Sequence, residues 1–230
     1  MNQFSRTELL LGKKNMELLK NSSVVIFGIG GVGSYVAESL ARSGIFNLTL
    51  VDNDKIVESN INRHICANFE TLGQLKTSAM KERILKINPL ANISTINEFV
   101  TEQNIYDVLD KNFSYVVDAI DTVSSKIQII LAAQKLNLPV ISCMGTGNKI
   151  NPQLLTIDDI YKTKYCPLAK VMRHELKKHA VQKLRVCYSP EQPKKIFNPN
   201  PSEKIIASTS FVPSVAGLII SAEVVNKIIG

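Results

Sequence analysis

The residues best suited to chemistry form a glycine-rich segment, Gly-Ile-Gly-Gly-Val-Gly, that runs from Gly28 to Gly33. An apolar run at 22–27 precedes it and helical spacing follows it, which predicts a turn from a strand into a helix. The first amide groups of such a helix favour an anion, so a nucleotide phosphate is the expected ligand. In this pattern Gly28 permits the tight turn, Gly30 lets the phosphate approach the backbone, and Gly33 lets helix and strand pack closely. A purely structural glycine turn is the alternative.

Polar side chains further along the chain indicate which nucleotide is bound. Asp52 ends the next apolar run, where its carboxylate could accept hydrogen bonds from ribose hydroxyls. A dinucleotide such as NAD would need nothing more. Arg63 and Lys76 could neutralise phosphate charge, and Asp121 could hold Mg²⁺ through a carboxylate oxygen. Each of these residues alone has an ordinary structural explanation, but together they favour ATP with Mg²⁺.

The elements that must position these side chains alternate in type through residue 145. Such alternation is typical of a doubly wound, Rossmann-like α/β fold with a mainly parallel sheet, and a run at 154–157 is expected to add an antiparallel C-terminal extension. Because the carboxyl ends of parallel strands share one edge, Asp52, Asp118 and Asp121 are expected to converge there. The expected strands are 22–27, 48–51, 93–100, 114–119 and 139–143, and the expected helices are 5–20, 32–43, 76–87, 104–110, 126–136, 167–179 and 213–228.

The net charge of +7 is concentrated in one stretch of this 230-residue chain. Ten of its 27 Lys and Arg residues lie between Lys162 and Lys195, and only Glu175 and Glu191 oppose them there. Clustered positive charge of this kind is expected of a protein that meets a polyanion. The alternative is a solvated helix face followed by a mobile loop, because four prolines lie within 189–202.

The cysteines and the apolar C-terminal segment bear on the location of the protein. No cysteine belongs to a Cys-x-x-Cys pair and no secretory signal opens the chain, so free thiols in a reducing cytoplasm are expected. The apolar stretch at 205–229 is interrupted by Pro213 and Glu223, which predicts a buried helix rather than a membrane span. The four cysteines are Cys66, Cys143, Cys166 and Cys187.

The motifs together resemble those of the ubiquitin-activating-enzyme-like superfamily. They are Gly-x-Gly-Gly-x-Gly, the Val-Asp-x-Asp at 51–54, the Ser-Asn-x-Asn-Arg at 59–63, Lys76, and the Asp-x-x-Asp at 118–121. That superfamily includes the adenylating enzymes for molybdopterin and thiamine sulfur carriers. The resemblance covers most of 4–150 and implies one adenylation domain over 1–230, with an N-terminal arm at 1–20 and a basic helix and loop at 162–204.

Further segments are similar to the branch of tRNA threonylcarbamoyladenosine dehydratases. The pieces are Arg-Thr-Glu-Leu-Leu-Leu-Gly at 6–12, the His that follows at 64, Ile-Asn-Pro at 87–89, the run at 115–121, and Asp-Asp-Ile-Tyr-Lys-Thr at 158–163 with Cys-Pro-Leu at 166–168. Those enzymes use ATP to cyclise the threonyl carboxylate of a modified adenosine beside the tRNA anticodon. The resemblance therefore implies an acyl-adenylate, a tRNA substrate and no catalytic cysteine.

The resemblance also assigns roles to particular residues. Arg63, Lys76 and Asp121 would be catalytic, and Arg6 would reach the nucleotide of the partner subunit in a homodimer. Asp121 would also bind Mg²⁺, and the loop at 145–148 could coordinate a monovalent cation such as Na⁺ or K⁺. The implied nucleotide-binding residues are Gly28, Gly30, Gly31, Gly33, Asp52, Asp54, Asn60, Arg63, Lys76 and Asp121, and the expected tRNA-binding residues are Lys170, Arg173, Lys177, Lys178, Lys183 and Arg185.

Several alternatives remain open at the level of sequence. The first is adenylation of the C-terminal glycine of a sulfur-carrier protein, which the missing zinc-binding cysteine pairs and the basic stretch disfavour. The second is an NAD-dependent oxidoreductase or a non-catalytic scaffold. A cysteine desulfurase system is a partner that the family suggests, whereas DNA is not expected. Cys187 is expected to be structural, with sulfur relay as the alternative, and His64 could face the nucleotide.

Overall fold

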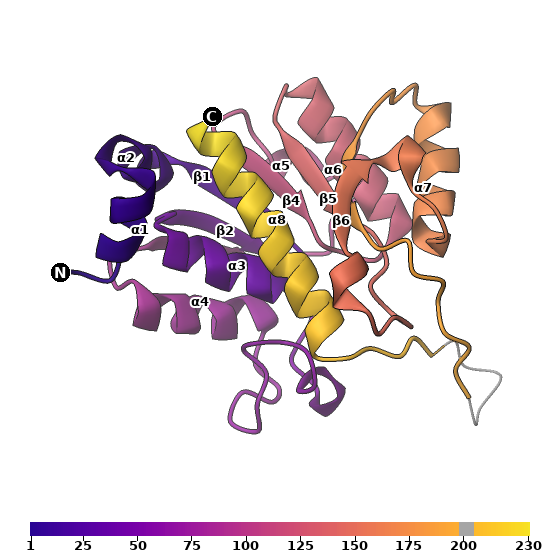
Figure 1. Cartoon of the computed structure of the whole chain (residues 1–230), viewed down its shortest axis with the longest axis horizontal. Helices are drawn as coiled ribbons and strands as arrows, with labels where there is room; N and C mark the ends of the chain where they lie inside the picture. Colours follow the sequence, from indigo (N-terminus) through magenta and orange to yellow (C-terminus); the bar gives the residue numbers. More distant parts are fainter. Residues whose placement is uncertain (198–204) are drawn as a thin grey trace.

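The computed structural model describes residues 1–197 and 205–230, and these form one seven-stranded sheet covered by helices on both faces (Figure 1). The strands are β1 (Ser23–Phe27), β2 (Asn47–Val51), β3 (Asn92–Ile96), β4 (Tyr115–Asp118), β5 (Val140–Cys143), β6 (Thr156–Asp159) and β7 (Arg185–Tyr188). The helices are α1 (Ser5–Leu11), α2 (Lys13–Asn21), α3 (Gly33–Ser43), α4 (Lys76–Ile87), α5 (Ile105–Val108), α6 (Val123–Lys135), α7 (Pro167–Lys178) and α8 (Phe211–Ile229).

The sheet has the strand order β3-β2-β1-β4-β5-β7-β6. Every neighbouring pair is parallel except β6 and β7, which pair antiparallel. This confirms the expected doubly wound, mainly parallel α/β fold with an antiparallel C-terminal extension. From β1 the chain builds outward to β2 and β3, then returns to place β4 on the other side of β1. The carboxyl ends of β1 and β4 therefore flank a switch point, where ligands bind in open α/β sheets.

Several predicted elements have different boundaries in the structure, and three of the differences are large. The arm predicted as one helix is two, α1 and α2, because Gly12 breaks it with φ +84°. The strand expected to run to residue 100 ends at Ile96, and the chain from there passes along the carboxyl edge of the sheet. The predicted loop at 189–202 is irregular through residue 197, and the rest of it lies outside the described residues.

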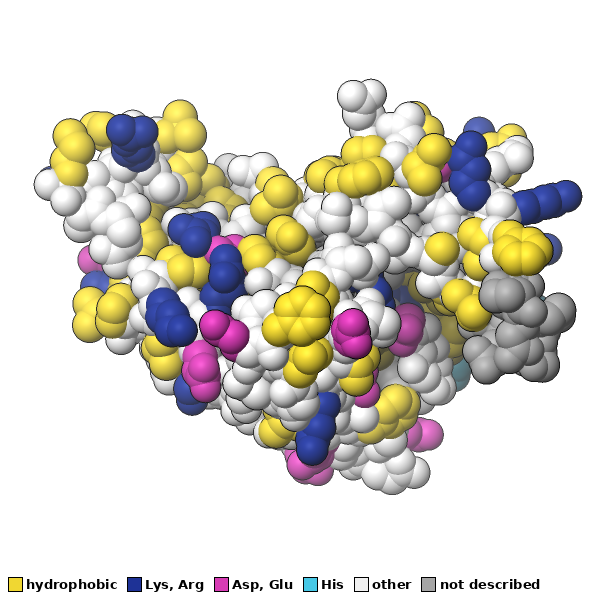
Figure 2. Space-filling model, turned by 90° about the horizontal axis from the view of Figure 1, so that it is seen from below, with side chains coloured by type: hydrophobic (Ala, Val, Ile, Leu, Met, Phe, Trp, Pro, Cys, Tyr) yellow, Lys and Arg dark blue, Asp and Glu magenta, His cyan; other side chains and the backbone are white. Residues whose placement is uncertain are grey.

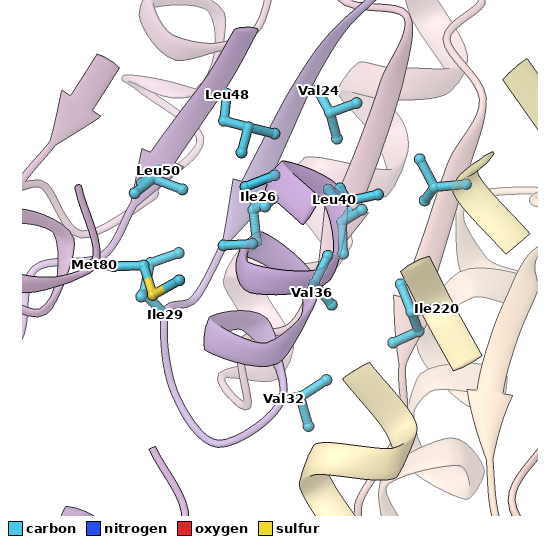
Figure 3. Close-up of a cluster of buried hydrophobic side chains, with 14 of the residues drawn as sticks. Val24, Ile26, Ile29, Val32, Val36, Leu40, Leu48, Leu50, Met80 and Ile220 are labelled. Carbon is cyan, nitrogen blue, oxygen red and sulfur yellow. The ribbon is translucent and has the colours of Figure 1, made fainter. Parts of the chain in front are cut away.

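Alternation along β1 divides the core between the two faces of the sheet. Val24 and Ile26 face the layer formed by α3, α4 and α8, whereas Val25 and Phe27 face the layer that contains α6. All four side chains are completely buried, as expected for a central strand of a parallel sheet. Figure 3 shows α3 held between the sheet and α8, so that the glycine loop entering α3 has a rigid support.

Helix α8 is long and apolar enough to cross a membrane by composition alone, with a mean hydropathy of 1.5 over its 18-residue window. It nevertheless packs along α3. A Cβ on Gly217 would lie 2.6 Å from the Val32 carbonyl oxygen, and the Ser221 hydroxyl donates to the Val36 carbonyl at 3.4 Å. The helix thus contributes one face to the core, as predicted, while its other face is uncovered (Figure 1).

Candidate nucleotide-binding site

A cavity of about 510 Å³ opens at the switch point between the carboxyl ends of β1 and β4. Figure 2 views this edge of the molecule from below and shows acidic and basic side chains intermixed over it. Most of the predicted nucleotide-binding residues line the cavity, although they come from five separate segments of the chain. Those residues are Gly28, Gly30, Gly31, Asp52, Asp54, Asn60, Arg63, Lys76 and Asp121.

The glycines of the loop have different physical roles. Gly28 has φ +87°, and a Cβ there would come within 2.8 Å of the Ala119 backbone. A Cβ on Gly33 would lie 1.7 Å from the Gly28 carbonyl oxygen, so the first turn of α3 excludes any side chain. Gly33 supports the loop from behind rather than lining the cavity. By contrast, a Cβ on Gly30 would have only ordinary contacts, the nearest being His64 Nε2 at 3.7 Å.

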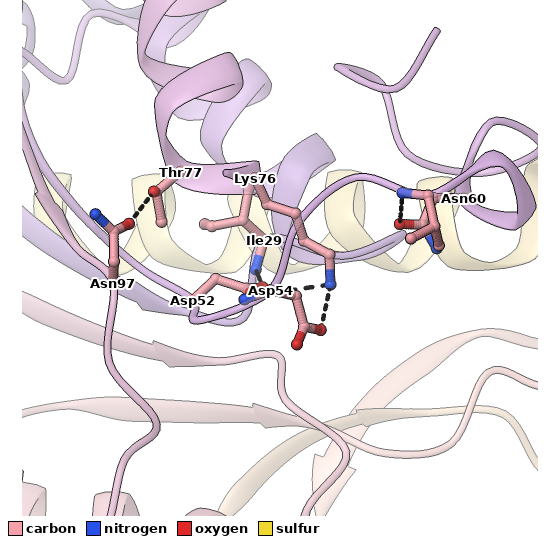
Figure 4. Close-up of polar contacts among 8 residues, drawn as sticks. Ile29, Asp52, Asp54, Asn60, Lys76, Thr77 and Asn97 are labelled. Atoms are coloured by element: carbon pink, nitrogen blue, oxygen red, sulfur yellow. Dashed lines mark hydrogen bonds and ion pairs between the residues drawn. The ribbon is translucent and has the colours of Figure 1, made fainter. Parts of the chain in front are cut away.

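Asp52 connects the end of β2 to the glycine loop (Figure 4). Its Oδ2 accepts a hydrogen bond from the Ile29 amide at 2.7 Å, and its Oδ1 accepts one from the Asp54 amide at 2.9 Å. Each carboxylate oxygen keeps a second lone pair for a ribose hydroxyl. Asp52 therefore shapes the loop as well as facing the cavity.

Lys76 begins α4 and reaches back across the same edge. Its Nζ lies 2.6 Å from Asp54 Oδ2 and 3.7 Å from Asp52 Oδ1 (Figure 4). The residue is 8% exposed, so its aliphatic stem is buried while its ammonium group reaches the cavity. The nearer partner, Asp54, has a largely exposed side chain and can turn away into water. The Lys76 ammonium group can then move to an incoming phosphate.

The turn at 58–64 carries Asn60 and Arg63. Asn60 Oδ1 accepts a hydrogen bond from the Val57 backbone amide at 3.2 Å, which closes the turn. The side-chain NH₂ group of Asn60 has no partner among the described residues. The Arg63 guanidinium donates to the Ser59 carbonyl at 2.7 Å and to Asn62 Oδ1 at 2.9 Å. The stem of Arg63 lies against the glycine loop, so a change of its terminal rotamer brings the guanidinium to a phosphate.

The two aspartates after β4 are separated by the fold, although the sequence predicts that both converge on the nucleotide. Asp118 is completely buried and faces away from the cavity, which corrects that expectation. Its Oδ2 lies 2.9 Å from Lys126 Nζ and accepts a 2.6 Å hydrogen bond from the Ser142 hydroxyl. Burial raises the pKa of the Asp118 carboxyl, and the Lys126 charge opposes that shift. Asp121 is exposed at the cavity.

Lys126 was not predicted from the sequence, and its ammonium group supports this edge of the sheet from inside the core. It donates to the carbonyl of Ile120 at 3.1 Å and to that of Cys143 at 2.9 Å, in addition to pairing with Asp118. It thereby ties the loop after β4 to the end of β5. A lysine beside the mainly apolar run at 127–133 was the available signal, because lysine is almost never fully buried without a partner.

The side chains at the cavity offer few ligands for a metal ion. No cluster of three or more His, Cys, Asp or Glu side chains occurs in residues 1–197 and 205–230. Asp121 makes no hydrogen bond or ion pair to those residues, so its oxygens are available. Magnesium in nucleotide sites is held by one or two carboxylates together with phosphates and water. One open carboxylate at the cavity fits that pattern, whereas it would not suit a resident all-protein metal site.

The six predicted tRNA-binding residues differ in whether their charged groups already have partners in the fold. Arg173 is half-buried and bonded to Thr163, Arg185 pairs with Glu223 at 2.9 Å, and Lys178 pairs with Glu175 at 2.8 Å. Arg185 begins β7, which runs parallel to β5, so it lies at the edge of the sheet opposite the cavity. The remaining three, Lys170, Lys177 and Lys183, are exposed without an ion pair in the described part of the chain.

The four cysteines are free and buried, as predicted. Cys187 in β7 is in register with Cys143 in β5. A hydrogen bond with Cys143 and burial raise the pKa of the Cys187 thiol well above its usual range. A buried thiol that resists ionisation is not a nucleophile, so the geometry supports the structural interpretation of Cys187.

Arg6 lies on the exposed surface of α1 and does not line the cavity. The arm packs beside the opposite edge of the sheet, where the rings of Phe4 and Phe46 lie 5.7 Å apart just before β2. Arg6 therefore cannot serve the nucleotide site of its own subunit in this arrangement.

The comparisons with known proteins agree with the geometry. A model described as the ThiF family matches residues 4–230. A tRNA threonylcarbamoyladenosine dehydratase of Bacillus subtilis is 40% identical, and the match covers 100% of this chain and 95% of the relative. An Escherichia coli relative with the same description is 38% identical over 76% of this chain and 65% of its own length. The crystal structure of E. coli tRNA N6-threonylcarbamoyladenosine dehydratase in complex with ATP superposes with a TM-score of 0.91, at 31% identity, covering 98% of this chain and 93% of that one.

Proposed function

This chain belongs to the ThiF family, and we propose that it is an ATP-dependent tRNA threonylcarbamoyladenosine dehydratase. The observation that carries the proposal is the cavity at the switch point, where the glycine loop, Asp52, Lys76 and Asp121 meet in a chain that is similar along its whole length to dehydratases. The likeness to an ATP complex indicates which ligand this cavity takes. No cysteine lies in the cavity lining, which suits a reaction without a thioester.

The chemistry follows from the need to make a carboxylate electrophilic. The threonyl carboxylate attacks the α-phosphate of ATP and releases pyrophosphate, and a nitrogen of the same substituent then closes the ring and releases AMP. The oxygen lost from the carboxylate leaves with AMP, so the net change in the nucleoside is loss of water. Lys76 and Arg63 would stabilise charge on the phosphates, and Asp52 would orient the ribose. Magnesium held at Asp121 would supply further neutralisation of the phosphates.

We also propose a route for the tRNA. Lys194 and Lys195 are exposed, and the Lys194 amide donates to the Asn148 carbonyl at 2.7 Å, close to Thr146 in the cavity wall. Lys and Arg side chains also project on the side of the molecule where α7 lies (Figures 1 and 2). A tRNA backbone that crosses this side, and contacts Lys170 on α7, could place its modified adenosine at the cavity.

A homodimer is proposed because α8 presents an apolar stripe to the surface. Phe211 and Leu218 on α8 are 44% and 48% exposed, and Leu9 and Leu10 on the arm are 79% and 84% exposed. Apolar surface of this kind is typical of interfaces. Pairing through α8 and the arm would let Arg6 of one protomer reach the nucleotide of its partner. Inactive Arg6→Ala and Lys76→Met protomers should then regain activity when mixed, whereas a monomeric protein would not.

Two further partners remain part of the proposal. Thr146 lines the cavity, so a monovalent cation could bind the loop at 145–148, although Asn148 Oδ1 already accepts the Ala207 amide at 2.8 Å. A cysteine desulfurase system would have to act by contact alone, because the four thiols are buried. We also propose that the enzyme acts in the cytoplasm, where a tRNA substrate is available.

The function is tested with tRNA that carries threonylcarbamoyladenosine. The purified protein, ATP and Mg²⁺ should convert that nucleoside to its cyclised form and release AMP and pyrophosphate. Persistence of the open form would contradict the proposal. ATP–pyrophosphate exchange that only a sulfur-carrier protein stimulates would instead favour adenylation of a protein terminus.

A further inference from the structure

His64 occupies a position in the cavity wall that the proposed mechanism does not use. It follows Arg63 at the end of the turn, and its amide donates to the Asn60 carbonyl at 3.0 Å. The residue is 5% exposed and lines the nucleotide cavity. The turn therefore fixes the backbone of His64 and directs its ring towards the glycine loop.

The two ring nitrogens of His64 have different surroundings. Nδ1 is buried and has no hydrogen-bond partner in the described part of the chain. Nε2 is the ring nitrogen that faces Gly30. A neutral imidazole carries one N–H and one bare nitrogen. Buried N–H groups without partners are rarer than buried lone pairs without partners, so the fold favours the tautomer with hydrogen on Nε2. That tautomer directs a donor at the cavity.

The space between Gly30 and His64 Nε2 is large enough for a side-chain atom, although the fold places none there. Gly28 and Gly33 lack side chains because the backbone would collide with them, but a Cβ on Gly30 would lie 3.7 Å from His64 Nε2, an ordinary contact. Packing within the chain therefore does not account for glycine at position 30. A ligand atom between Gly30 and His64 does account for it, and the helix start beyond Gly30 favours an anionic one.

The imidazole remains neutral beside this anion site. Burial, together with the charges of Lys76 and Arg63, lowers the pKa of His64 to about 3, and the charge of Asp54 opposes that shift. A neutral donor binds phosphate without exchanging a proton, so its protonation state does not change during the reaction. It also adds no third positive charge beside Lys76 and Arg63.

We propose that His64 is a nucleotide-contacting residue whose Nε2–H donates a hydrogen bond to the ATP phosphate oxygen that lies against Gly30. The inference rests on the proposed function, because it requires ATP in this cavity. The bond fixes the phosphate against the glycine loop and thereby orients it for attack by the carboxylate.

Three substitutions separate a donor at Nε2 from other roles of the ring. His64→Gln places an amide N–H near the position of Nε2, His64→Asn places one near Nδ1, and His64→Leu keeps the volume without a donor. We expect His64→Leu and His64→Asn to weaken ATP binding, measured by calorimetry, about tenfold or more, as for loss of a hydrogen bond to a charged group. His64→Gln should stay within about threefold of the wild type.

Folding is monitored in the same samples. His64→Leu removes a buried polar atom that has no partner, so it should unfold at no lower denaturant concentration than the wild type. Binding of ATP by His64→Leu within twofold of the wild type would overturn the inference. Failure of the wild type itself to bind ATP would instead contradict the proposed function.

A spectroscopic measurement tests the tautomer without any substitution. In ¹⁵N-histidine spectra of the wild-type protein, His64 should show hydrogen on Nε2 alone at neutral pH, and ATP should shift that N–H signal. Hydrogen on Nδ1, or a signal that ATP leaves unchanged, would overturn the inference.

Discussion

Two lysine–aspartate pairs at the same edge of the sheet show how burial separates a binding group from a structural one. Lys76 and Lys126 each lie at or near the start of a helix, and each pairs with an aspartate at or just beyond the end of a strand. Lys126 is completely buried, and its ammonium group is shared among Asp118 and two carbonyls. Lys76 faces the cavity, and its partner Asp54 is mostly exposed.

The difference lies in how much hydrogen-bonding capacity the protein itself uses. The three donors of Lys126 all have partners within the fold, so nothing remains for a ligand. The ammonium group of Lys76 has carboxylate partners only, and the nearer one can swing into solvent. The same pair of residue types therefore stabilises the fold in one region and is available to phosphate in the other.

The largest expected effect comes from removing the buried lysine, Lys126. Lys126→Met leaves Asp118 buried without its counter-ion, which should lower the free energy of unfolding by about 3–5 kcal/mol. Denaturant titration measures the loss. The double variant Asp118→Asn, Lys126→Met removes both charges and should recover part of it. A single variant as stable as the wild type would show that the pair is not structural.

Removing Lys76, which faces the cavity, should instead lower activity strongly and stability only slightly. Lys76→Met is expected to lower kcat about 100- to 1,000-fold, as for loss of a group that stabilises charge in the transition state. Its free energy of unfolding should change by only about 1 kcal/mol, because Asp54 can turn to water. Single-turnover assays and denaturant titration on the same preparation check both parts. A loss of stability that matches the loss of activity would erase the contrast with Lys126.

The two aspartates after β4 extend the comparison. Asp121→Ala should reduce turnover about 100-fold or more through loss of metal binding, and raise the Mg²⁺ concentration needed for half-maximal activity. Its unfolding curve should match that of the wild type, because Asp121 has no partner among the residues that the structure describes. Near-normal activity with an unchanged Mg²⁺ requirement would remove Asp121 from the metal role.

Low pH should destabilise the folded protein through the buried, neutral side chain of His64. The pKa of His64 is lowered from 6.5 to about 3, so below pH 6.5 the unfolded chain binds a proton that the folded protein does not. Its contribution to stability is complete above pH 6.5 and declines as the pH falls towards 3, by at most about 1.4 kcal/mol per pH unit. The wild type should therefore lose more stability than His64→Gln between pH 7 and pH 4. Parallel pH profiles would contradict a buried neutral imidazole.

The smallest effects are expected at the basic surface. Charge reversal at Lys194 and Lys195, near the cavity, should weaken tRNA binding and reduce the salt dependence by about one phosphate contact per residue. The same change at Lys177 and Lys178 should do less, since Lys178 already pairs with Glu175 and neither residue lines the cavity. Equal effects of the two pairs would place the tRNA over the whole helix.

Local patterns predicted the elements of the fold closely. The helix expected at 76–87 has those limits in the structure, and its end follows from the Asn-Pro at 88–89. The glycine loop and the acidic ends of β2 and β4 were likewise predicted, since strand, turn and helix are determined by residues near one another in sequence. Strand β3 is shorter than predicted because apolar alternation continues into residues that line the cavity instead of pairing.

The sequence by itself determined that a nucleotide phosphate meets a glycine turn, with Lys76 and Asp121 among the residues that could approach it. Only the tertiary structure decided which charged groups are available. It buried Asp118 against Lys126, paired Arg185 with Glu223 on the last helix, and left the Nδ1 of His64 without a partner among the described residues. Burial and partner choice depend on contacts between distant segments, which residue types and spacing do not encode locally.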